Sequence, residues 1–109
     1  MRNTENGTCF HVVIREDNLR VNLCRLLESK SFIVEYVCVF HKKPESVRHY
    51  HIWLKVNSVC CRADIARMFV IKKGYVDVSR LPRAQWIRYF YDSESKYELI
   101  CSRYEKKAL

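Results

Sequence analysis

Two histidines separated by one residue are the feature of this chain whose type and spacing could do chemistry. His49 and His51 lie in the segment 48–56, RHYHIWLKV, in which β-branched and aromatic residues alternate with polar ones. Such alternation is typical of a half-buried β-strand, whose successive side chains point to opposite faces. The two imidazoles would then share one face and could hold a single metal ion through their ring nitrogens. A pair of surface histidines that binds nothing is the alternative interpretation of the same pattern.

The residues around this pair resemble the HUH endonucleases, which are the nicking domains of rolling-circle replication initiators, conjugative relaxases and some transposases. His49-Tyr50-His51 is similar to the His-hydrophobic-His signature of that group. An apolar strand that ends at His41 precedes it through a short polar loop, as in the initiators of small plasmids and single-stranded DNA viruses. Downstream, the segment 86–97, WIRYFYDSESKY, resembles the nucleophile motif of the group. The two motifs match in order and separation, and the resemblance spans roughly residues 9 to 97.

The resemblance implies a third metal ligand near the end of the strand that precedes the histidine pair. The matching position, eight residues before His49, is His41. Glu45, in the intervening loop, is the alternative third ligand or a fourth one. His11 is expected to be a strand residue beside the site rather than a ligand. The expected cofactor is a divalent metal ion, Mn²⁺ or Mg²⁺.

The resemblance also implies a tyrosine nucleophile, and the matching residue is Tyr89. In a helical projection Tyr91 falls on the apolar arc of its segment, whereas Tyr89 falls on the polar side. Viral members of the group often carry a lysine three residues after the tyrosine, but this chain has Asp92 there. Tyr104, which is followed three residues later by Lys107, is the reserve nucleophile.

The charge of the chain favours an anionic partner. The 109 residues include 20 Lys and Arg against 12 Asp and Glu, which gives a formal net charge of +8 and favours nucleic acid. Cations spread along the expected loops and helix edges predict a surface that follows DNA phosphates. Trp53 is expected to be a stacking platform for an unpaired base. The expected phosphate-binding residues are Lys42, Lys43, Arg48, Lys55, Arg83 and Arg88.

The pattern of elements predicts an α+β fold in one domain over residues 1–109. Strands are expected over 9–14, 32–41, 49–56 and 75–79, and the strand over 32–41 is apolar enough to be central. Helices are expected from Asp17 to about Lys30, from Asn57 or Ser58 to about Val70, and from Pro82 to about Asp92, whereas 97–104 is ambiguous between strand and helix. This is a ferredoxin-like split β-α-β-β-α-β antiparallel sheet with an added helix that carries the nucleophilic tyrosine.

The six cysteines are expected to be reduced, because the first eight residues are polar and lack the apolar core of a signal peptide. The compartment expected is therefore the cytoplasm or a host nucleus, and no membrane partner is expected.

Together these features predict an enzyme that nicks and joins single-stranded DNA at a replication origin through a covalent 5′-phosphotyrosine. The expected partners are origin DNA and a replicative helicase domain or protein, with the chain acting as a monomer or as an origin-dependent oligomer. A single-tyrosine transposase or relaxase is one alternative. A non-catalytic module of the RNA-recognition type, built on the same β-α-β-β-α-β plan, is the other.

Overall fold

The computed structural model describes residues 5–41, 48–79, 85, 88 and 97–103 of the chain. In chain order the elements are β1 (Asn6–Arg15), the 3-10 turn η1 (Glu16–Asn18), α1 (Leu23–Ser29), β2 (Ile33–His41), β3 (His49–Cys61), α2 (Arg62–Phe69), the 3-10 turn η2 (Lys73–Tyr75), β4 (Val76–Val78) and β5 (Tyr97–Arg103).

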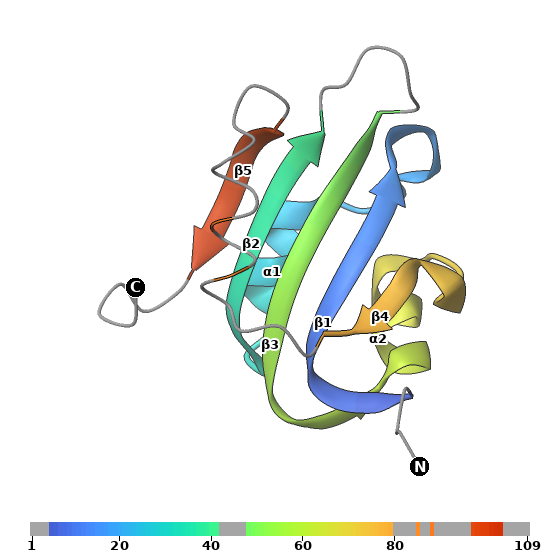
Figure 1. Ribbon diagram of the computed structural model, residues 1–109, viewed down its shortest axis with the longest axis vertical. Helices are drawn as coiled ribbons and strands as arrows, with labels where there is room; N and C mark the ends of the chain where they lie inside the picture. Colours follow the sequence, from blue (N-terminus) through green and yellow to red (C-terminus); the bar gives the residue numbers. More distant parts are fainter. Residues whose placement is uncertain (1–4, 42–47, 80–84, 86–87, 89–96, 104–109) are drawn as a thin grey trace.

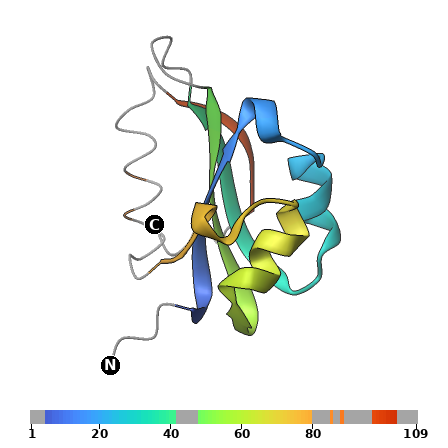
Figure 2. The ribbon, with the colours of Figure 1, turned by 90° about the vertical axis from the view of Figure 1, so that its right-hand side faces the viewer.

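The strands form one five-stranded antiparallel sheet in the order β4-β1-β3-β2-β5, with β3 in the middle (Figure 1). Both α1 and α2 lie on the same face of this sheet (Figure 2). The structure is therefore α+β, and it is compatible with the ferredoxin-like arrangement that the sequence predicts. The segment 97–103, ambiguous in sequence, is an edge strand that pairs with β2.

The alternation along β3 separates the two faces of the sheet. Ile52, Leu54 and Val56 are each at most 1% exposed and belong to the core beneath the helices. From β1 the core receives Phe10 and Val12, and α2 contributes its own buried side chains, Ile65 among them. The core face predicted for β3 is confirmed. The opposite face, which carries His49 and His51, is called the histidine face below.

Two helix boundaries differ from those predicted. Asp17 does not cap α1: it lies in η1, and the cap is Asn22, whose side-chain oxygen accepts a hydrogen bond from the backbone N–H of Arg25 at 3.1 Å. The second helix begins only at Arg62, because β3 continues to Cys61 and its last residues pair with the start of β1 beyond a β-bulge. Both errors have the same cause: Asp17, Asn57 and Ser58 are residue types favoured at helix N-termini, but Asp17 lies in η1 and the other two lie in β3.

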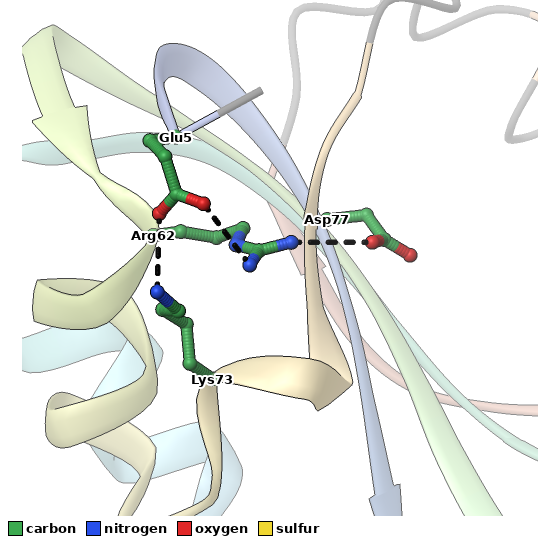
Figure 3. A network of polar contacts seen from close by, with 4 residues as sticks. All are labelled: Glu5, Arg62, Lys73 and Asp77. Carbon is green, nitrogen blue, oxygen red and sulfur yellow. Dashed lines mark hydrogen bonds and ion pairs between the residues drawn. The ribbon is translucent and has the colours of Figure 1, made fainter. Parts of the chain in front are cut away.

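The short strand β4 is tied to its neighbours by ion pairs (Figure 3). The guanidinium of Arg62 lies 3.3 Å from a carboxylate oxygen of Glu5 and 3.9 Å from one of Asp77, and the ammonium of Lys73 lies 3.4 Å from Glu5. The backbone N–H of Arg62 also donates to the carbonyl of Glu5 at 2.7 Å. Exposed pairs contribute little each, about 0–1 kcal/mol. Their effect is positional, because they join the start of β1, the start of α2 and the segment that leads into β4.

The third predicted helix and its tyrosine lie almost wholly outside the described residues. Gln85 and Arg88 are helical, and both side chains are exposed. Tyr89, Tyr91 and Tyr104 are outside the described part of the chain, so their predicted roles stay predictions.

Candidate metal centre

Three histidines meet where β2 and β3 pair. His41 is the last residue of β2 and is the direct cross-strand partner of His49, the first residue of β3. His51, two residues along β3, lies on the same face and is paired with Val39. Directly paired residues on one face have Cβ atoms about 4.5–5.5 Å apart. The antiparallel hairpin therefore brings the three imidazoles together without help from any other element.

The ring nitrogens of these histidines converge. Nδ1 of His41 lies 2.9 Å from Nε2 of His49, which in turn lies 3.0 Å from Nε2 of His51. All three ligand atoms fall within 4.8 Å of one another. One ring nitrogen carries at most one proton. Nε2 of His49 therefore donates to one of its two neighbours and accepts from the other, or it accepts from both.

These spacings fit a metal ion. At a metal–nitrogen distance of about 2.1 Å, two ligands at right angles are about 3.0 Å apart. Two of the three separations, 2.9 and 3.0 Å, are close to that edge of an octahedron. Neutral imidazoles suit Zn²⁺, Cu²⁺, Fe²⁺ and Ni²⁺, whereas Mn²⁺ and Mg²⁺ favour oxygen ligands such as water and phosphate. The prediction that His41, His49 and His51 can bind a divalent metal ion is compatible with the structure.

A fourth histidine fixes the orientation of His51. Nε2 of His11, on β1, lies 2.9 Å from Nδ1 of His51, and the two rings are parallel, with an interplanar angle of 2° and centroids 5.1 Å apart. If Nε2 of His51 binds a metal, its proton resides on Nδ1, which then donates to Nε2 of His11. Such outer hydrogen bonds set the tautomer of a metal-ligating histidine. His11 lies beside the site, as expected, but its hydrogen bond is visible only in the structure.

The site keeps His51 neutral. Burial, followed by the charges of the neighbouring His11, His49 and His41, lowers the pKa of His51 to about 3. Burial also lowers the pKa of His11, although the carboxylate of Asp77, its cross-strand partner on β4, opposes that shift. A neutral imidazole has the free lone pair that metal binding requires. The imidazoles of His51 and His11 are therefore neutral near pH 7.

The expectation for Trp53 is wrong. Its side chain is only 1% exposed, so its ring cannot stack on an unpaired base at the surface. Trp53 shares the histidine face with Val37 and Val39, which are 1% and 3% exposed. The histidine face is therefore buried around these three residues, and it opens toward the end of the hairpin where the histidines lie, each of them partly exposed.

The structure describes three of the six predicted phosphate-binding cations. Lys55 is exposed on the histidine face of β3. Arg48 is also exposed, but its guanidinium lies 3.3 Å from Glu16 and over the ring of Phe40, 4.9 Å from the centroid. Arg88 is exposed as well. Lys42, Lys43 and Arg83, together with the alternative ligand Glu45, lie outside the described residues.

No family model, curated protein or solved structure matches the chain. Within the described residues, no helix has both the length and the apolar character needed to cross a bilayer.

Proposed function

We propose that this chain is a metal-dependent endonuclease of the HUH type, which nicks and rejoins single-stranded DNA at a replication origin. The observation that carries the proposal is the convergence of the ring nitrogens of His41, His49 and His51 on one face of the sheet. The two sequence motifs and the net charge of +8 support it, and the strand order is compatible with the ferredoxin-like fold expected for this function.

The three histidines would hold Mn²⁺ or Mg²⁺, and the bound ion would polarise a non-bridging oxygen of the scissile phosphate. With a metal ion bound, His11 would keep Nε2 of His51 directed at His49 by accepting the hydrogen of Nδ1. Burial keeps His51 neutral, so that its lone pair is free at the pH of the cell. Lys55 and the excess of cations attract the DNA backbone.

The tyrosine nucleophile would be Tyr89, by the resemblance of its motif. Its phenolic oxygen attacks the phosphorus and forms a phosphotyrosyl ester, while the bond from phosphorus to the 3′ oxygen breaks. The proton lost by the phenol balances the proton that the 3′ oxygen gains, which leaves a free 3′ hydroxyl for priming. Because the ester retains the energy of the phosphodiester bond, the reverse reaction rejoins the strand.

A non-catalytic module of the RNA-recognition type is disfavoured by the composition of the histidine face. Such modules stack bases on exposed aromatic side chains of the sheet. Here the aromatic residue in the middle of this face, Trp53, is buried, and among the side chains that the structure describes on this face the partly exposed rings are imidazoles.

The test is an incubation with end-labelled single-stranded DNA and Mn²⁺, followed by a denaturing gel. We expect a covalent protein–DNA band that disappears in the His49→Ala/His51→Ala variant and in Tyr89→Phe. The matched control is Tyr91→Phe, which removes the same atom two residues away and should retain the band. A band that persists in the double histidine variant would refute the metal centre, and loss of the band in Tyr91→Phe alone would refute the choice of Tyr89.

A further inference from the structure

A second candidate site lies at the edge of the sheet beside the histidines. A cavity of about 650 Å³ opens where β1 continues past the short strand β4, between the end of α2, η1 and the segment before β4. Cavities of a few hundred to about 1,000 Å³ accommodate small-molecule and cofactor-sized ligands. The residues of its lining that matter here are Arg15, Arg20, Arg67, Val70, Lys72 and Tyr75.

The lining is basic. It contains four cations and, among the described residues, no carboxylate. Asp17 lies 2.9 Å from Arg15, and Asp64 lies 3.2 Å from Arg67, so these two cations are partly neutralised. Arg20 donates to the backbone carbonyls of Asp17 and Leu19, at 3.3 Å each, and these carbonyls leave its charge in place. Within the described ranges, no carboxylate is paired with Arg20 or Lys72, so both retain positive charge for an anionic ligand.

The cavity lies one strand away from the candidate metal centre. Arg15 is the direct cross-strand partner of His49, and Val13, which also lines the cavity, is the partner of His51. Neighbouring strands are about 4.8 Å apart. The end of α2 also lines the cavity and lies on the face of the sheet opposite the histidine face, so a DNA strand that contacts both sites would pass around the free edge of β1.

The rim has an aromatic side chain and an unusual backbone conformation. Tyr75 is 37% exposed, which leaves ring surface accessible to a base. Val70, 59% exposed, has φ 59° and ψ 49°, in the left-handed region that disfavours a β-branched residue. Its N–H donates to the carbonyl of Arg67 at 3.2 Å, and the chain then turns toward Lys72. This left-handed residue is the C-cap of α2, and it sets the direction in which the chain leaves the helix along the cavity.

We propose that this cavity binds a nucleotide of the same single strand whose scissile phosphate lies at the histidines, with Arg20 and Lys72 attracting its phosphate and Tyr75 stacking on its base. The inference rests on the proposed function, because it takes single-stranded DNA as the ligand. A positively charged groove combined with an aromatic platform is how proteins bind single strands without reading their sequence. The cavity would hold the strand in register while the histidines hold the scissile phosphate.

The experiment measures binding of a fluorescein-labelled 15-mer of oligo(dT) by anisotropy, in EDTA so that neither metal binding nor cleavage contributes. Arg20→Gln/Lys72→Gln should weaken binding about tenfold and flatten the salt dependence by about 0.7 units, for the one phosphate that both cations contact. The matched control, Arg25→Gln/Lys30→Gln, removes the same two charges from α1 and its C-terminal end and should change the affinity far less. Tyr75→Leu should also weaken binding about tenfold, but it should not weaken binding of a 15-mer made of abasic residues.

Equal losses in the two double variants would overturn the proposal, because general attraction would then explain the binding. Equal losses of Tyr75→Leu on the dT and abasic strands would refute the stacking. An acidic decapeptide that displaces oligo(dT) from the wild type, but not from Arg20→Gln/Lys72→Gln, would assign the cavity to a protein partner instead.

The experiments distinguish a failure of the cavity proposal from a failure of the proposed function. If the wild type forms a covalent product and the cavity variants bind normally, only the cavity is wrong; if no covalent product forms and the cavity variants lose affinity, only the enzyme is wrong.

Discussion

Replacing His11 by phenylalanine isolates the hydrogen bond that orients His51. The Phe side chain keeps an aromatic ring at position 11, but it removes the nitrogen that lies 2.9 Å from Nδ1 of His51 and places a C–H group against that atom. Loss of an outer hydrogen bond of this kind weakens metal binding about 10- to 100-fold. We therefore expect the dissociation constant for Mn²⁺ to rise by that factor, which corresponds to about 1.4–2.7 kcal/mol.

The same change costs some stability, which must be measured separately. A buried N–H left without its partner costs about 1–3 kcal/mol, partly offset because an apolar ring replaces a polar one. Titration calorimetry with Mn²⁺ at pH 7.5, below the melting temperature of each variant, gives the affinity of the folded protein. His11→Gln is the control, because its amide oxygen can still accept from Nδ1 of His51 and should recover most of the affinity.

Wild-type Mn²⁺ affinity in His11→Phe would refute the reasoning, provided that His51→Ala abolishes binding. Equal losses in His11→Phe and His11→Gln would refute it as well, because the acceptor would then be irrelevant.

Two further predictions concern stability. The pKa of histidine is about 6.5 in the unfolded chain, whereas that of folded His51 is about 3. Between pH 7 and pH 5 the unfolded chain therefore gains a proton that folded His51 does not, and the metal-free protein should lose up to about 2 kcal/mol of stability through this group. Urea unfolding at both pH values checks this, and an unchanged pH dependence of stability in His51→Gln would contradict it. Val70→Gly should leave the free energy of unfolding unchanged or raise it by up to about 1 kcal/mol, because glycine adopts the left-handed conformation at the end of α2 without strain. Val70→Ala should raise the free energy of unfolding less. A loss above about 1 kcal/mol in the glycine variant would show that Val70 makes a stabilising contact.

The pattern of residues along each strand predicts the three candidate metal ligands, but not the contacts that they make with other strands. Alternation places His49 and His51 on one face of β3, and it places His41 on the corresponding face of β2. The hydrogen bond from His51 to His11 depends on the pairing of β1 with β3, which joins residues 40 positions apart. Periodicity along one strand carries no information about the register of such a distant pair.

The burial of Trp53 is a second feature that alternation does not predict. We expected the face opposite the core to be exposed, as in a sheet covered on one side. The composition of β2 already indicated otherwise, because Val37 and Val39 are apolar and share that face with Trp53. An apolar run on both faces of a strand is typical of a strand that is covered on both sides.

The predicted start of α1 was wrong for a local reason. Asp17 and Asn22 are both favourable caps, and only the packing of Leu23 and Leu27 in the core selects the later start of α1. The cavity lined by Arg20, Lys72 and Tyr75 was not predicted as a site, because its residues come from two segments that are far apart in the sequence, 13–20 and 67–75.

The measurement that tests the central claim most directly is peptide mapping of the covalent product formed with single-stranded DNA and Mn²⁺. After digestion by protease and nuclease, mass spectrometry should locate one nucleotide-phosphate adduct on Tyr89, formed only when His49 and His51 are intact and only when Mn²⁺ is present. An adduct on another residue, an adduct formed equally in EDTA, or the absence of any adduct with active protein and metal would contradict the account.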